Sequence, residues 1–318
     1  GELLRTYILQ CLSSEKGETD YRVLDYTSAR FKKQKSDFFR LCGGSLGGKA
    51  RGLAFARFMI KQSGIEEEFE DVTIRVPDCA VVGTHEFDQF MKDNQLWQKA
   101  LNIEDNKKLE RAFKKARLSI DLILKLESFI LDHKNPLAVR SSSLLEDSQY
   151  QPLAGCYKTI MLPNNSRSTK KRLNELMIAI KSVFASTFKG EAKSLLDSTG
   201  HRIEEEKMAV VIQEIVGQSY KSKRFYPTFS GVLKSINYYP VSYMKRNEGV
   251  AYLALGFGRT IVDGEKCLRI SPEYPLILPQ FYSVKATKQN SQNQFYGLQL
   301  KASENNSHED LHTYSIKK

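Results

Sequence analysis

The spacing of apolar residues predicts amphipathic helices, because side chains three or four positions apart lie on one face of a helix. This period extends over residues 105–133 and 168–189, with lysines and arginines between the apolar positions. The apolar faces comprise Leu109, Phe113, Ala116, Ile120, Ile123 and Ile130 in the first helix, and Leu173, Leu176, Ile180, Phe184 and Phe188 in the second. We expect the first helix to support the strand that follows it.

Residues with capping preferences mark where the helices begin and end. Ser168 or Thr169 would accept the first free backbone N–H groups of the second long helix, and Gly190 would follow its last turn. Thr84 would cap a shorter helix over residues 85–92. These positions set the helix boundaries that the sequence predicts.

Short apolar runs bounded by turn residues predict strands in both halves of the chain. The earlier runs cover residues 72–82, 137–139 and 156–162, and the first of them is bent at Pro77. The charged segment 201–207 is a candidate hinge before a strand-rich part. The strands expected there lie within residues 208–216, 225–237, 249–262 and 295–300. This mixture of helices and strands predicts an α+β fold.

Length and composition place the chain among globular proteins of about two domains or subdomains. It has 318 residues, and no apolar run reaches the length of about 18 residues that a membrane-spanning helix needs. No basic secretory leader is visible in the first ten residues. The scattered cysteines make no C-x-x-C pair, so we expect reduced thiols in a cytoplasmic protein: Cys11, Cys42, Cys79, Cys156 and Cys267.

The net charge of +11 allows two interpretations. One is a nucleic-acid-binding protein, and the other is a basic surface that faces a polyphosphate ligand or an acidic partner domain. Lysines and arginines are spread over the predicted helices instead of forming an arm, and no helix-turn-helix, zinc-finger or RNP pattern is visible. The sequence therefore favours the second interpretation.

The segment from Pro136 to Leu162 has the most informative chemistry. A short apolar strand leads into Arg140 and the hydroxyls of Ser141, Ser142 and Ser143, and a second strand begins after Ala154-Gly155. Arginine binds phosphate oxygens bidentately, and serine hydroxyls add donors without bulk. The alternative is an arginine in a structural ion pair beside an ordinary serine-rich loop.

A glycine-rich stretch begins at Gly43 and reads Gly-Gly-Ser-Leu-Gly-Gly-Lys-Ala-Arg-Gly-Leu-Ala. Its spacing matches a P-loop through Lys49, but Ala50 stands where a P-loop needs serine or threonine, and no strongly apolar strand is visible before it. We therefore expect a glycine turn followed by a helix, with Leu53, Ala56 and Ile60 on its apolar face. Lys49 at the helix start suits phosphate, although a solvated lysine is the alternative.

These two blocks together resemble the nucleotide-binding domain of pyruvate phosphate dikinases and phosphoenolpyruvate synthases. The matching strings are Val-Arg-Ser-Ser-Ser-Leu-Leu-Glu-Asp-Ser with Ala-Gly after it, and Gly-Gly-Lys-Ala-x-Gly-Leu-Ala before it. The resemblance extends from about Gly43 to about Pro275 and implies an ATP-grasp-like fold, in which two subdomains have the nucleotide cleft between them. It divides the chain into an N-terminal extension or linker (1–36), an N-terminal subdomain with a helical insert (37–205) and an incomplete C-terminal subdomain (206–318).

The resemblance implies ATP as ligand and assigns roles to individual residues. Lys49 and Arg140 would hold the phosphates for catalysis, while Glu146 is either a metal or ribose ligand or a simple loop carboxylate. The remaining predicted nucleotide contacts are Ser141, Ser142, Gly155, Thr159, Gln213, Glu214 and Val216. Magnesium is also implied, but the family's metal-holding carboxylate and its Gln-Thr-Arg motif have no equivalent before Lys318.

In the family, this domain phosphorylates a histidine on a mobile second domain, and a third domain passes the phosphate to pyruvate. The sequence contains neither of these partner domains, and we interpret His85 as a helix-start residue. Arg259 and Lys158 stand where better-known members carry acidic residues, so independent catalysis by this chain is not expected. A nucleotide-sensing module without transfer activity is the main alternative, ahead of a nucleic-acid-binding protein.

Overall fold

The computed structural model describes residues 23–26, 38–143, 157–190, 192–194, 202–220, 223–241, 243–300 and 311–316. Helices and strands are mixed along the chain, as an α+β fold requires. The chain forms two compact units, Gly1–Ile215 (unit 1) and Val216–Lys318 (unit 2). Within the described ranges, no helix is long and apolar enough to span a membrane.

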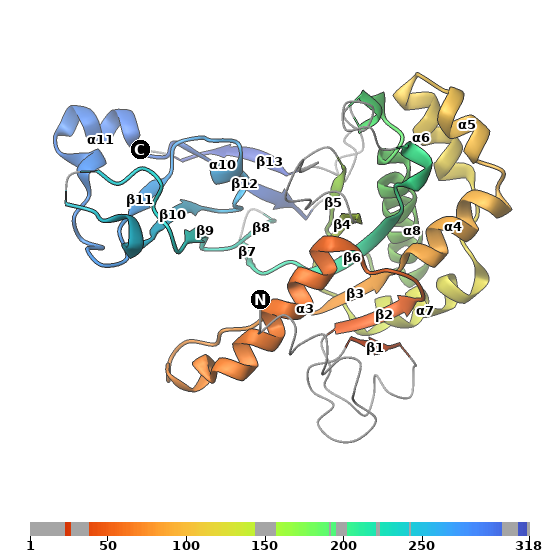
Figure 1. The fold of residues 1–318 in the computed structure, drawn as a ribbon, viewed down its shortest axis with the longest axis horizontal. Coiled ribbons are helices and arrows are strands. Elements are labelled where there is room, and N and C mark those ends of the chain that lie inside the picture. The colour runs from red at the N-terminus through yellow and green to blue at the C-terminus, as the bar shows by residue number, and fades with distance from the viewer. Residues whose placement is uncertain are drawn as a thin grey trace. The chain divides into compact units, whose positions relative to one another are not determined.

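Unit 1 is built on a six-stranded sheet (Figure 1). Its first three strands in space are parallel, whereas β6 runs antiparallel to both of its neighbours, and β5 runs antiparallel to β4. The spatial order is β1 (Leu24–Asp25), β2 (Phe38–Cys42), β3 (Cys79–Val82), β6 (Met208–Glu214), β4 (Leu137–Ser143) and β5 (Thr159–Leu162). Strand β6, which the sequence analysis places after the hinge, therefore belongs to the sheet of unit 1.

Helices cover both faces of this sheet, and the strands bury alternate side chains on each face. Ala50 and Ala54 of α3 (Gly47–Ser63) pack against the face that includes Cys79, Val81 and Val211. Figure 1 shows the remaining helices of unit 1 on the other side of the sheet from α3. They are α4 (Thr84–Asp93), α5 (Trp97–Asn102), α6 (Asn106–Lys115), α7 (Ile120–Asp132) and α8 (Thr169–Ser186).

The long helix predicted over residues 105–133 is wrong, because the chain forms two helices there, α6 and α7. The backbone of Arg117 donates to and accepts from the side chain of Asn94, at 2.9 Å in both bonds. Ser119 then caps α7 and donates its own N–H to Glu86 at 2.9 Å. Contacts from another part of the chain therefore break the helix, and Ile120, predicted to be on the apolar face, is 77% exposed.

The second long helix is confirmed, and its five predicted apolar residues are all buried. Ser168 is the N-cap, with its hydroxyl accepting a bond from the N–H of Lys171. The helix ends at Ser186, earlier than predicted, because Phe188 N–H turns back to Ala185 O in a tighter bond. Thr187 is therefore the C-cap, and Phe188 follows it at the position predicted for Gly190.

Three further local predictions are corrected by the structure. Thr84 is the first residue of α4 and Gly83 is its N-cap, since the Thr84 hydroxyl instead accepts a bond from Ser45 N–H at 2.9 Å. The buried residues of α3 are Gly47, Ala50, Ala54, Arg57 and Phe58, whereas the predicted Leu53, Ala56 and Ile60 are only half-buried. Of these three, Leu53 packs against the same core. The expected strand over 72–82 is limited to β3, whereas β2 is a buried strand directly before the glycine-rich stretch.

Unit 2 contains a three-stranded sheet, β11-β10-β9, and a four-stranded sheet, β13-β12-β8-β7. Gly256 lies at φ +77°, where an added Cβ would come within 2.6 Å of Tyr296 O, so the backbone of this residue approaches β12 closely. The elements are β7 (Gln218–Tyr220), β8 (Arg224–Tyr226), β9 (Phe229–Lys234), β10 (Val250–Leu255), α10 (Arg259–Val262), β11 (Leu268–Ile270), α11 (Val284–Asn290), β12 (Gln294–Gln299) and β13 (His312–Ser315).

Short 3-10 turns complete the described structure. They are η2 (Ile65–Glu67), η3 (Ile203–Glu205), η4 (Arg246–Glu248) and η5 (Pro279–Phe281). The Ser283 hydroxyl caps the start of α11 by accepting a bond from Ala286 N–H. Among the described cysteines, Cys42, Cys79 and Cys267 are free thiols.

Candidate functional site

The glycine-rich turn and the arginine–serine strand meet at the first turn of α3. Gly47 has φ +75°, and a Cβ at this position would overlap the carbonyl oxygen of Ser142. The Ser142 hydroxyl donates to Leu46 O at 2.8 Å and accepts from Ala50 N–H at 3.0 Å. Strand β4 therefore fixes the start of α3, although the two blocks are far apart in the sequence.

Lys49 completes this junction from the helix side. Its ammonium lies 3.2 Å from the Ser141 hydroxyl, and the lysine is partly exposed. Helix α3 has no acidic residue in its first turn, so the partial positive charge of its N-terminus and the lysine charge add together. This end of the helix offers a favourable environment for an anion.

Arg140 lies on the α3 face of the sheet with other polar side chains. Its guanidinium donates to the Gln213 side chain across β4 and β6 at 3.2 Å. Thr159, which is exposed, stands directly opposite Arg140 on β5 and therefore shares its face. Ser142 lies two positions after Arg140 and also contacts α3. The structure thus collects Lys49 and these four polar residues in one region of unit 1, which we call the α3-face cluster: Lys49, Arg140, Ser142, Thr159 and Gln213.

A buried cysteine lies beneath this cluster. Cys79 is 1% exposed, and burial raises the pKa of its thiol to about 12, although the positive charge of Arg140 acts in the opposite direction. The thiol is therefore protonated at neutral pH and serves as a packing residue.

Other predicted site residues do not join the cluster. Glu214 follows Gln213 in β6, and its side chain takes the opposite direction, toward Asn135, which donates to its carboxylate at 3.3 Å. Val216 is the first residue of unit 2 and is 61% exposed. Gly155 and Glu146 lie outside the described residues.

A cavity of about 610 Å³ opens beside Cys42 and Gly43, near the starts of α4 and α7. Glu86 lines it, is 2% exposed, and accepts bonds from Ser119 N–H and Oγ at 2.9 and 2.6 Å. Burial raises the pKa of Glu86, and the two bonds from Ser119 oppose that shift. Because this carboxylate holds the start of α7, its role is structural. Sequence reasoning missed the cavity because its walls come from separated segments.

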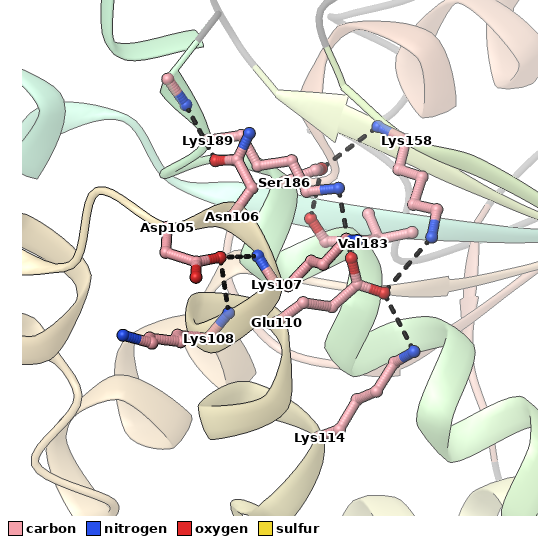
Figure 2. A network of polar contacts seen from close by, with 11 residues as sticks. Asp105, Asn106, Lys107, Lys108, Glu110, Lys114, Lys158, Val183, Ser186 and Lys189 are labelled. Atoms are coloured by element: carbon pink, nitrogen blue, oxygen red, sulfur yellow. Dashed lines mark hydrogen bonds and ion pairs between the residues drawn. The ribbon is translucent and has the colours of Figure 1, made fainter.

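Glu110 lies among three lysines on the helical side of unit 1 (Figure 2). Its carboxylate is 2.9 Å from Lys114, 3.4 Å from Lys158 and 3.2 Å from Lys189. Burial alone would raise the pKa of Glu110, but the bond from Lys114 and the other two lysine charges outweigh it and lower the pKa to about 2. Lys158, which departs from the acidic residue expected by resemblance, is thus part of a charged network.

Comparison with known proteins gives two matches. Residues 44–316 match the family model described as pyruvate phosphate dikinase, AMP/ATP-binding domain. The chain is also 29% identical, over 192 residues, to a Bacillus subtilis (strain 168) protein described as "Uncharacterized phosphotransferase YvkC". That alignment covers 59% of this chain and 20% of the relative, so the chain spans about a fifth of that protein's length.

Proposed function

This chain belongs to the family of pyruvate phosphate dikinase AMP/ATP-binding domains, and from that premise we propose that it binds ATP for phosphoryl transfer to a histidine on another domain. We also propose the ATP-grasp-like fold that the sequence resemblance implies. The division into residues 1–36, 37–205 and 206–318 is part of the same proposal, with β6, at the start of the third part, pairing within the sheet of unit 1. A distant relative described as a phosphotransferase supports the class of reaction.

The α3-face cluster is the observation that carries the proposal. Phosphoryl transfer depends mainly on positioning the phosphates and neutralising their charge. Lys49 and Arg140 supply two positive charges beside the positive end of α3, and Ser142 ties these elements together. Arg140 would grip two phosphate oxygens at once through its planar guanidinium. Ser141 is fully buried and would contribute through its bond to Lys49, while the Gly155 turn would add hydrogen-bond donors.

Strand β6 would contact the adenine base. Gln213 already bonds to Arg140 at 3.2 Å, so one side chain links the proposed phosphate and base ends of the ligand. For Glu214 and Val216, we propose contacts through backbone atoms, because the Glu214 side chain points away from the α3-face cluster. Thr159 would bond to the ligand from β5.

Magnesium is the cofactor that the family resemblance implies, and the described residues of unit 2 do not fit it at the expected position. Arg259 stands where the resemblance expects a glutamate, and its Nε lies 3.0 Å from Asp263. Its guanidinium lies 5.1 Å above the Tyr296 ring. A second cation would be repelled there, so we propose that the magnesium ligands lie outside this chain.

A nucleotide sensor without transfer activity is the second candidate. It is favoured by Lys158, which replaces an expected acidic residue and lies 3.4 Å from Glu110. The two functions differ in one outcome. A sensor binds ATP but leaves it intact when magnesium and a downstream histidine domain from a relative are added, whereas the phosphotransferase labels that histidine with the ATP phosphate.

Calorimetric titration with ATP tests the binding part of the proposal. We expect a micromolar to millimolar dissociation constant, about −8 to −4 kcal/mol. Arg140→Ala should weaken binding by at least tenfold, and Arg111→Ala is the matched control because Arg111 is an exposed residue of α6. Equal ATP affinity in wild type and Arg140→Ala would remove Arg140 from the site. Steeply salt-dependent DNA binding without ATP binding would overturn the proposal.

A further inference from the structure

Three potential metal ligands from separate segments meet where the inner strands β3 and β6 of unit 1 begin and end. Asp78 directly precedes β3, His133 follows α7, and Glu214 is the last residue of β6. One ring nitrogen of His133 and one carboxylate oxygen from each of the two acids lie within 4.8 Å of one another. We propose that these residues form a binding site for a divalent transition-metal ion, separate from the α3-face cluster.

His133 is buried, and a backbone bond fixes the direction of its ring. It is 7% exposed, and its Nδ1 lies 3.0 Å from the backbone oxygen of Phe129. A carbonyl oxygen can only accept, so Nδ1 donates in this bond, and Nε2 is the ring nitrogen left to bind a metal once it carries no proton. Histidines that bind metal commonly donate their other ring N–H to a carbonyl or carboxylate in this way.

The surroundings of His133 also fix its position. Its ring stacks on Phe129 with centroids 4.0 Å apart. Its backbone oxygen accepts bonds from Asn164 at 2.9 Å and from Arg172 at 3.0 Å. The imidazole is therefore restrained by its ring and by its backbone, and a ligand held in advance pays less conformational entropy on binding.

The two carboxylates are held near the imidazole by the sheet. Glu214 N–H donates to the backbone oxygen of Asp78 at 2.9 Å, which extends the pairing of β6 with β3 by one bond. Asn135 donates to the Glu214 carboxylate at 3.3 Å, as a second layer of support behind a ligand. Both side chains are half-buried. The charges of the two carboxylates match the charge of one divalent cation.

The mixture of one nitrogen and two oxygen ligands selects the type of metal. Magnesium prefers all-oxygen sites with several waters, whereas imidazole favours zinc and its neighbours in the first transition row. Zinc binds three protein ligands at about 2.0–2.2 Å and takes water in the fourth position. The two carboxylates can shorten the present separations by side-chain rotation. We therefore assign the site to zinc or a similar ion.

Metal at this position would stabilise the end of β6. Glu214 is adjacent to Gln213 in the chain, and the chain passes into unit 2 after Ile215. A bound ion would link β6 to the segments before β3 and β4, in addition to the strand pairing that already joins them. This stabilisation needs no nucleotide, so the site can be tested without ATP.

Equilibrium dialysis against zinc, after treatment of the whole chain with a chelator, tests the proposal. We expect one zinc per chain with a micromolar or lower dissociation constant, and a melting temperature that rises with zinc concentration. Glu214→Gln should weaken zinc binding by at least tenfold while keeping an oxygen to accept from Asn135. Cobalt should give intense visible absorption typical of four-coordination in wild type, and this absorption should be lost in Glu214→Gln.

Two further variants keep the test decisive. His133→Gln removes the nitrogen ligand, but because His133 is buried it could unfold the chain, so Asp78→Asn provides a second ligand deletion. His85→Gln is the matched control, since His85 is an exposed histidine of unit 1, and it should leave zinc affinity unchanged. Zinc binding that persists in Glu214→Gln and Asp78→Asn, or no stoichiometric binding by wild type, would overturn the site and indicate a metal-free polar cluster.

Discussion

Two glycines of α3 should respond oppositely to alanine substitution. Gly47 has φ +75° and faces Ser142, so Gly47→Ala places a Cβ onto the β4 backbone. Gly52 lies in the same helix, is exposed, and has no atom within 4 Å of an added Cβ. Comparing the stabilities of the two alanine variants therefore distinguishes the loss of the junction between α3 and β4 from the general effect of alanine in a helix.

The expected magnitudes follow from the local geometry. A left-handed conformation costs alanine about 1–2 kcal/mol. Displacement of α3 also weakens the two bonds of the Ser142 hydroxyl, at about 1 kcal/mol each. We expect Gly47→Ala to lower the free energy of unfolding of unit 1 by about 3–4 kcal/mol. Gly52→Ala should raise it by about 0.5–1 kcal/mol, because glycine in a helix interior is less favourable than alanine.

Urea denaturation followed by tryptophan fluorescence measures both effects. The single tryptophan, Trp97, lies in unit 1 and packs against Phe87 and Phe188, so it reports on this unit specifically. Midpoint and slope should be compared, since a changed slope would indicate a changed native or denatured state. Equal stabilities for Gly47→Ala and Gly52→Ala, or a loss below about 1 kcal/mol for Gly47→Ala, would refute the junction described above.

The remaining predictions concern three polar side chains. Arg140→Lys should lose most of the ATP affinity that Arg140→Ala loses, about 1.5–3 kcal/mol by calorimetry, because lysine cannot bind bidentately. The pKa of Glu110 is depressed to about 2, so its stabilisation is present above about pH 4.5 and is lost between there and pH 2. Because the lysines are partly exposed, this stabilisation amounts to about 1–2 kcal/mol. In urea titrations, the free energy of unfolding of wild type should fall by that amount as the pH is lowered, whereas Glu110→Gln should lack this contribution at every pH. Asn94→Ala should cost about 1–3 kcal/mol in urea unfolding by freeing the Arg117 backbone.

The sequence predicts those parts of the fold in which one local pattern dominates. The helix over Thr169–Ser186 has an unbroken apolar period and a serine cap, and both are present in the structure. The break between α6 and α7 could not be predicted, because Asn94 and Glu86 impose it from outside the segment. Strand β2 escaped detection because Arg40, half-buried and paired with Asp25 at 2.7 Å, interrupts a short apolar run.

The candidate site was predictable as motifs but not as geometry. Lys49, Arg140 and Ser142 lie in blocks whose composition suggests phosphate binding, and the structure brings these blocks together. Strand alternation alone places the side chains of Gln213 and Glu214 on opposite faces of the sheet, so only Gln213 can share a face with Arg140. The meeting of Glu214 with Asp78 and His133 depends on tertiary structure, so no short motif indicates it.

The most direct test of the central claim is a comparison of ATP and AMP affinities in wild type and Arg140→Ala. The two ligands share the base and ribose and differ in the outer phosphates, which Lys49 and Arg140 are proposed to hold. The account predicts that wild type binds ATP more tightly than AMP. In Arg140→Ala, the ratio of ATP affinity to AMP affinity should fall by at least tenfold, while the AMP affinity stays nearly constant. An equal loss for both nucleotides, or an unchanged preference for ATP, would contradict it.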